Sequence, residues 1–183
     1  PVSGRGSKIQ PAVEEVIVKI AILVEKDYQD MEVWYPYLRL LEAGHEVVGV
    51  GTTQTGYKGK YGYPIECHKT IDQVSAGDFD GVIIPGGWAP DFLRLSSGVC
   101  GFVAEMDRQG KLVAAICHAG WVLVSAGILR GRAVTSYKAI RNDLINAGAQ
   151  WADSETVVDR NLNTARTPMD LPAFMKAVLA FLG

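Results

Sequence analysis

Residues 112–121 read LVAAICHAGW and place a cysteine between an apolar run and a candidate helix. Cys117 follows Ala115 by two positions and precedes Ala119 and Gly120 by two and three positions. This spacing is typical of a nucleophile elbow, a tight strand-to-helix turn in which large neighbours clash, here with cysteine in place of serine. We expect the helix N-terminus to favour the thiolate and lower the thiol pKa. The alternative is a buried structural cysteine, a common fate of free thiols.

His118 is the candidate base for this cysteine. Adjacent side chains do not face each other in a regular helix or strand, so only the irregular backbone of an elbow could bring the ring to the sulfur. In the alternative, the ring points sideways into a cleft and the backbone N–H of His118 serves as an oxyanion donor.

A second turn, Pro85-Gly86-Gly87-Trp88, follows another apolar run. Glycines let a backbone approach a ligand closely and direct N–H groups toward it. If this turn lies beside the elbow, the N–H groups of Gly87 and His118 would form an oxyanion hole with two donors. The alternative is an ordinary glycine-rich turn. The spacing of a phosphate-binding loop is absent.

Glu32 falls in the first turn of a helix that we expect Asp30 to cap. Its carboxyl group either reaches the elbow or lies at the surface as a partner of the helix dipole. Helical spacing predicts that one apolar face of this helix is buried. That face comprises Met31, Trp34, Leu38 and Leu41.

The remaining elements follow from hydrophobic periodicity. Strands are predicted at residues 16–24, 45–50, 79–84, 112–116 and 133–136. Helices are predicted at residues 99–108, 119–126, 139–147 and 171–182, in addition to the one that begins at residue 30. Residues 51–70 are typical of a small hairpin or loop, and residues 156–159 and 161–164 of a hairpin around Arg160. Strands that alternate with helices indicate an α/β fold whose mostly parallel sheet has helices on both faces.

The composition is that of a folded domain. The chain has 183 residues, 48% of them hydrophobic, which predicts one domain over residues 17–183. The first ten residues are polar and contain glycine and serine, so we expect a loose extension over residues 1–16. A formal net charge of −2 makes nucleic acid a poor candidate for a partner. Three cysteines suit reduced thiols in the cytoplasm better than a disulfide framework. Polar residues and glycines interrupt the most apolar stretch, so we expect no membrane segment.

Several ordered motifs resemble the PfpI family of intracellular cysteine peptidases. They are ICHAG at residues 116–120, SAGILRGR at 125–132, DLINAGA at 143–149, DMEVWYP at 30–36 and IPGGWAPD at 84–91. The resemblance runs from about residue 18 to the C-terminus. It implies membership of the class I glutamine-amidotransferase-like superfamily and a flavodoxin-like three-layer sandwich.

The resemblance also implies roles for individual residues. Cys117 matches the nucleophile, His118 its partner, Glu32 a buried glutamate in contact with the sulfur, and Tyr137 a tyrosine that lines the pocket. Asp91 stands where peptidase members have a glutamate that completes the triad from a neighbouring subunit, and its side chain is one methylene shorter.

Two further positions depart from the family pattern at the entrance of the expected cleft. Gln29 replaces a residue that is commonly acidic, which removes a charge. Trp88 replaces a residue that is often basic, which makes the entrance more apolar.

Three functions remain open at this point. The first is a cysteine hydrolase, either a peptidase or a general stress protein, in which Cys117 attacks a carbonyl group. The second is a glutathione-independent glyoxalase or deglycase in which Cys117 adds to a small aldehyde and Glu32 carries a proton. The third is a stress protein without turnover that senses oxidants through Cys117 or holds unfolded proteins. We expect a peptide or small carbonyl substrate, no cofactor or metal, and a homodimer or hexamer.

Overall fold

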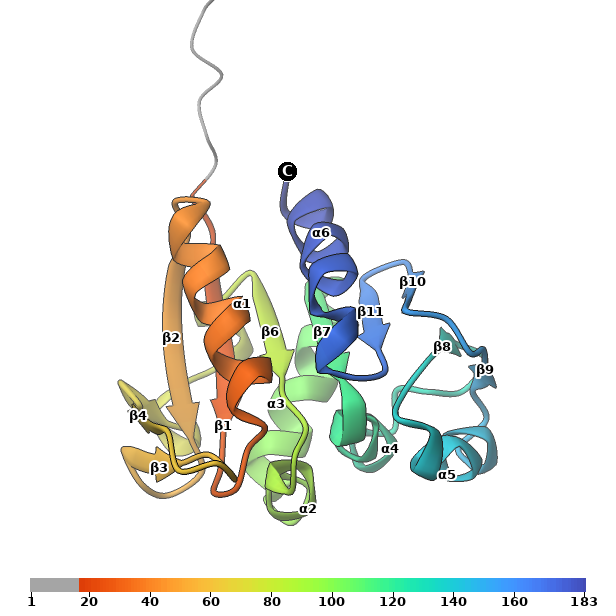
Figure 1. The fold of residues 1–183 in the computed structure, drawn as a ribbon, viewed down its shortest axis with the longest axis horizontal. Helices are drawn as coiled ribbons and strands as arrows, with labels where there is room; N and C mark the ends of the chain where they lie inside the picture. Colours follow the sequence, from red (N-terminus) through yellow and green to blue (C-terminus); the bar gives the residue numbers. More distant parts are fainter. Residues whose placement is uncertain (1–16) are drawn as a thin grey trace, which may run out of the picture.

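A seven-stranded sheet forms the centre of the computed structural model, which describes residues 17–183 (Figure 1). The predicted extension over residues 1–16 lies outside the described residues. The strand order is β10-β11-β7-β6-β1-β2-β5, and all neighbours are parallel except β10 and β11. In chain order these strands are β1 (Lys19–Val24), β2 (Glu46–Gly51), β5 (Lys69–Thr70), β6 (Gly81–Ile84), β7 (Leu112–Ile116), β10 (Thr156–Asp159) and β11 (Leu162–Ala165).

Two smaller strand pairs lie outside the main sheet. An antiparallel hairpin joins β3 (Gly56–Lys58) to β4 (Pro64–Glu66), as predicted for residues 51–70. A parallel pair joins β8 (Ala133–Val134) to β9 (Gln150–Trp151).

Helices cover both faces of the main sheet. They are α1 (Asp30–Glu42), α2 (Ala89–Leu93), α3 (Ser97–Arg108), α4 (Gly120–Ala126), α5 (Arg141–Asn146) and α6 (Leu171–Leu182). Figure 1 shows α1 and α6 on the near face, where they contact each other, while α3 and α4 pack together behind the sheet. The predicted α/β sandwich of flavodoxin-like type is therefore the fold of this chain. None of the helices within residues 17–183 is long and apolar enough to cross a membrane.

The central strands are apolar on both faces because helices cover both faces. Every residue of β6 and β7 is buried, as is every residue of β1 after Lys19. The bounds of β7 and α6 match the predicted ranges. The helix predicted at residues 139–147 is divided into a 3-10 turn, Lys138–Ile140, and the short α5.

The prediction for α1 was wrong in its cap and in its buried face. Gln29 is the N-cap, since its side chain accepts a hydrogen bond from the N–H of Met31 at 2.7 Å. The predicted apolar face lies largely at the surface: Met31, Leu38 and Leu41 are 53%, 57% and 46% exposed. The buried residues are Glu32, Val33, Pro36 and Leu40. The hydropathy pattern fails to identify the buried face of α1 because that face includes Glu32 and Pro36.

Candidate active site

Cys117 lies in an elbow between β7 and α4. Its φ of 63° is in the left-handed region, which costs roughly 1–2 kcal/mol for a residue with a side chain. A 3-10 turn, Cys117–Ala119, leads into α4. Strain of this kind persists only where the surroundings enforce it, and it is concentrated at functional sites. The small-residue spacing therefore folds into the geometry that it predicts.

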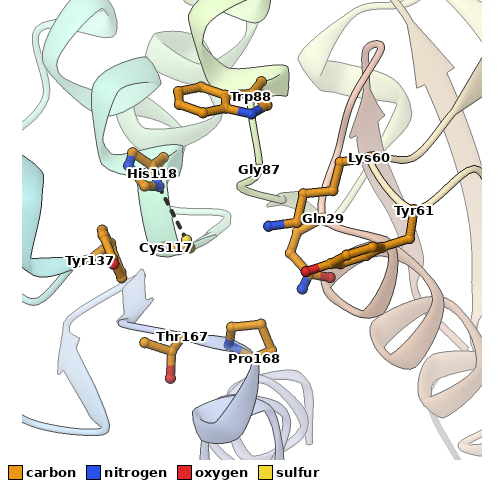
Figure 2. A pocket seen from close by; sticks show the side chains of 10 residues that line it. All are labelled: Gln29, Lys60, Tyr61, Gly87, Trp88, Cys117, His118, Tyr137, Thr167 and Pro168. Carbon is orange, nitrogen blue, oxygen red and sulfur yellow. Dashed lines mark hydrogen bonds between the residues drawn. The ribbon is translucent and has the colours of Figure 1, made fainter.

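His118 turns its ring toward the sulfur. The distance from Cys117 Sγ to His118 Nδ1 is 3.3 Å, so the irregular backbone brings adjacent side chains into contact (Figure 2). The ring stacks on Tyr137, with centroids 4.8 Å apart and planes 28° apart. Burial, aided by the charge of Lys60, lowers the pKa of His118. The imidazole is therefore neutral at pH 7 and can accept the thiol proton.

Glu32 is fully buried and does not lie at the surface. Its Oε2 accepts a hydrogen bond from the N–H of Gly86 at 2.7 Å, while its Oε1 has no hydrogen-bond partner. Burial raises the pKa of this carboxyl group to about 7, although the Gly86 N–H and the Cys117 side chain act in the opposite direction. Glu32 can therefore take up and release a proton near neutrality.

Gly86 leaves room for this carboxyl group beside the elbow. A Cβ at Gly86 would lie 2.6 Å from Glu32 Oε2, 2.6 Å from Cys117 Cβ and 3.1 Å from Cys117 Sγ. Its own N–H is occupied by Glu32, so Gly86 positions the glutamate and is not an oxyanion donor.

Gly87 and His118 supply the N–H groups that point at the sulfur. Both favour the thiolate of Cys117. Gly87 has a φ of 73°, and a Cβ there would lie 2.4 Å from the backbone nitrogen of Gln29, so no other residue fits this turn. The two N–H groups have the arrangement expected of an oxyanion hole, and their catalytic role stays a prediction.

The expected lowering of the Cys117 pKa was wrong. Burial and the nearby Glu32 carboxylate raise the pKa of this thiol to about 12, outweighing the two N–H groups. The α-helix begins only at Gly120, so its dipole is not directed at the sulfur as closely as the sequence suggested. The resting sulfur is therefore a thiol, and its proton must pass to a neighbouring group when it reacts.

An open pocket of about 510 Å³ gives access to the sulfur. Figure 2 shows Cys117, His118 and Tyr137 on one side, with Gln29, Lys60 and Tyr61 opposite them. The lining residues not anticipated from the sequence are Lys60, Tyr61, Thr167 and Pro168. The first two belong to the predicted hairpin region, but no local signal shows that this hairpin returns to the elbow. Within residues 17–183, no three potential metal ligands cluster.

Residues 18–181 match the DJ-1/PfpI family. The chain belongs to this family. Its relatives include "Deglycase PfpI" of Pyrococcus furiosus, "Protein/nucleic acid deglycase 2" of Escherichia coli and "Putative cysteine protease YraA" of Bacillus subtilis. Each is 42% identical to it over 90% of this chain and 98–99% of the relative.

Solved structures in the family share the fold. A two-domain protein from Anabaena variabilis with DJ-1/ThiJ/PfpI-like and ferritin-like domains has a TM-score of 0.89 at 44% identity, and the match covers 91% of this chain and 48% of that one. Drosophila melanogaster DJ-1beta has a TM-score of 0.86 at 27% identity, and the match covers 91% of each chain.

Of two further positions singled out by the family resemblance, Trp88 lines the pocket and Asp91 does not. Trp88 is 58% exposed and lines the pocket, with its ring centroid 6.2 Å from that of His118. Asp91 is exposed on α2 and does not line this pocket. Within the described part of the chain, neither Asp91 nor any other carboxylate forms a hydrogen bond with His118. An acid that orients this imidazole would have to come from elsewhere.

Proposed function

We propose that this chain is a cysteine-dependent deglycase that acts on small α-oxoaldehydes and on the adducts they form with thiols or amines. The observation that carries the proposal is the state of Glu32. One of its carboxylate oxygens is held by Gly86, the other is unpartnered, and its pKa is raised to about 7 by burial beside Cys117. A carboxyl group in this state is suited to moving a proton within a bound intermediate. The names of the deglycase relatives support the same chemistry.

The first step is the addition of sulfur to the aldehyde carbon. Cys117 Sγ forms a bond to this carbon while its proton passes to Nδ1 of His118, 3.3 Å away. Negative charge develops on the aldehyde oxygen, where the N–H groups of Gly87 and His118 stabilise it. The oxygen then takes the proton from His118, which completes a hemithioacetal and returns the imidazole to its neutral form.

The second step uses Glu32. Its unpartnered oxygen removes the hydrogen from the carbon bonded to sulfur, and the electron pair moves toward the ketone oxygen to form an enediolate. The proton is returned to the neighbouring carbon, while the hydroxyl proton passes to the former ketone oxygen. This transfer converts the hemithioacetal and ketone into a thioester and an alcohol. Water then hydrolyses the thioester, which releases a 2-hydroxy acid and restores the thiol. When the substrate is an adduct, Cys117 Sγ bonds to the former aldehyde carbon as the bond from that carbon to the thiol or amine breaks. The proton of Cys117 leaves on the released thiol or amine, and the same path follows.

Formation of lactate from methylglyoxal by the purified protein tests this proposal. We expect turnover by the wild type, loss of at least about 100-fold in Cys117→Ala and Glu32→Gln, and normal turnover in the control Cys100→Ala. Cys100 is a half-buried cysteine on α3, so its substitution controls for the loss of a thiol. Full activity of Glu32→Gln would contradict the proposal.

Peptide hydrolysis is the second candidate function. The Cys117–His118 contact and the name of the Bacillus relative support it. Acyl transfer from a peptide needs no proton transfer between two substrate carbons, so Glu32→Gln should retain peptidase activity while losing lactate formation. Fluorogenic peptides assayed with the same variants separate the two reactions. Absence of both would favour a stress protein that acts through oxidation of Cys117.

A further inference from the structure

Lys60 points into the pocket from the wall opposite the reacting sulfur. Figure 2 shows its side chain extended from the β3–β4 hairpin toward the space in front of Cys117. It is the single charged side chain among the described residues that line this pocket, since His118 is neutral. The ammonium group is also close enough to influence the ionisation of Glu32 and His118, although burial dominates at both.

No carboxylate neutralises this ammonium group within residues 17–183, where Lys60 forms no ion pair. Asp30 is an acidic residue in contact with the same hairpin. Its two oxygens accept hydrogen bonds from the N–H groups of Tyr61 and Tyr63 at 3.0 and 3.1 Å, so it fixes the hairpin backbone. Lys60 Nζ lies instead 5.1 Å from the centroid of the exposed Tyr61 ring.

Gln29 adds a second donor on the same wall. It is 7% exposed, and its Oε1 is committed to the N–H of Met31 at the start of α1. This hydrogen bond fixes the amide orientation and leaves the NH₂ group for the pocket. A carboxylate at this position would pair with Lys60, whereas the neutral amide leaves the positive charge available.

We propose that Lys60 and Gln29 form a carboxylate-binding subsite, so that the preferred substrates are carbonyl compounds that carry a negatively charged group. An ammonium group and an amide NH₂ match the two oxygens of a carboxylate. The pocket of about 510 Å³ has room for an amino-acid-sized adduct between this wall and Cys117. The identity of the substrate rests on the proposed function, while the preference for anions at Cys117 does not.

Alkylation of Cys117 measures the anion preference without any turnover. Iodoacetate and iodoacetamide have nearly the same size and differ by one charge, so the ratio of their rates at Cys117 reports the electrostatic environment of the approaching reagent. Peptide mapping by mass spectrometry gives both rates. We expect the iodoacetate-to-iodoacetamide ratio to fall about fivefold in Lys60→Gln, the effect of one partly screened charge. Lys60→Arg should retain the ratio, and Gln29→Glu should lower it.

Lys58→Gln is the matched control, because Lys58 is an exposed lysine on the same hairpin that does not line the pocket. Its ratio should equal that of the wild type. The wild-type ratio should also fall as salt is raised to about 0.5 M, which screens the charge of Lys60. An equal ratio in the wild type and Lys60→Gln would overturn the proposal, whatever the activity of either protein.

Turnover tests the substrate class separately. Methylglyoxal adducts of N-acetylcysteine and of N-acetylcysteamine differ by one carboxylate. Lys60→Gln should raise KM about fivefold for the anionic adduct and leave the neutral adduct unchanged. Equal effects on both adducts would contradict the substrate assignment. If neither adduct is turned over while the alkylation ratio still depends on Lys60, the proposed function fails and the anion subsite stands.

Discussion

The backbone N–H of Tyr137 donates a hydrogen bond to the carbonyl oxygen of Cys117 over 3.1 Å, so the chain that follows β8 is attached directly to the elbow. The Tyr137 ring then stacks on His118, the residue next to that carbonyl. Trp121 contacts the same imidazole, with its ring centroid 5.3 Å away. The orientation of His118 is therefore set by aromatic packing on more than one side.

Removal of the Tyr137 ring should disorder the imidazole. We expect Tyr137→Ala to lower kcat by about 10-fold and Tyr137→Phe to stay within about twofold of the wild type, because phenylalanine keeps the stacking. Lactate formation measures kcat, and thermal unfolding shows whether both variants are folded. If Tyr137→Phe lost as much activity as Tyr137→Ala, the hydroxyl group rather than the stacked ring would be responsible.

Glu32 should make the protein less stable as pH rises. Its pKa is raised from 4.5 to about 7 in the folded state, so the folded state binds this proton more tightly than the unfolded state. The resulting stability is present below pH 4.5 and is lost as pH rises through 7. The raised pKa of Glu32 contributes of order 3 kcal/mol to the free energy of unfolding below pH 4.5, and this contribution is lost above pH 7.

Glu32→Gln isolates this effect from that of His118, whose lowered pKa acts in the opposite direction. The amide can still accept the Gly86 N–H, so the variant should be more stable than the wild type at pH 8 and closer to it at pH 5. Urea unfolding at both pH values measures the difference. A pH-independent difference between the two proteins would show that Glu32 has an ordinary pKa.

Gly86→Ala should damage the site by steric conflict. The added methyl group would lie 2.6 Å from both Cys117 Cβ and Glu32 Oε2, so we expect at least about 100-fold loss of activity and roughly 1–3 kcal/mol of destabilisation. Gly101→Ala in α3 is the control, since a Cβ there meets nothing within 4 Å. It should keep full activity and gain up to about 1 kcal/mol of stability from helix propensity. An active Gly86→Ala protein would contradict the packing described for the elbow.

We propose that the protein is a homodimer or larger assembly in which Asp91 approaches His118 of a neighbouring subunit. The exposure of Asp91 on α2 and of Trp88 at the pocket mouth supports this arrangement. The neighbouring Pro90 is buried and Phe92 is half-buried under Lys26, so the apolar surface there is smaller than the sequence suggested.

Sedimentation and activity assays of wild type and Asp91→Ala test the two parts of this proposal. We expect an assembled wild type and an Asp91→Ala variant with at least fivefold lower kcat, because His118 would lose its orienting acid. A fully active monomer would exclude the shared site. An assembled and fully active Asp91→Ala would exclude Asp91 from the reaction.

The sequence was most informative where geometry permits few residue types. The elbow was predictable because small residues must flank Cys117 in so tight a turn, and the turn at Gly86 and Gly87 because only glycine fits both positions. Strand β7 was predicted to the residue, since a fully buried parallel strand is a continuous apolar run.

Long-range contacts and the electrostatics of the site could not be predicted from local sequence patterns. The hairpin that brings Lys60 to Cys117 is held by hydrogen bonds to Tyr28 and Asp30, which no local pattern encodes. The direction of the Cys117 pKa shift depends on the balance between burial, the charge of Glu32 and two N–H groups. The balance can be evaluated only when the three segments that carry these groups are placed in space.

The pocket is assembled from residues that run from Gln29 to Pro168, across almost the whole described chain. A ribosome-bound or truncated chain that ends soon after residue 117 would therefore contain the cysteine but lack Tyr137, Thr167 and Pro168. During synthesis the thiol and the wall that carries Lys60 are therefore made before the wall that carries Tyr137, Thr167 and Pro168. Thr167 and Pro168 lie just before α6, which packs against β7 and β11, so the pocket is complete only when this C-terminal segment is in place.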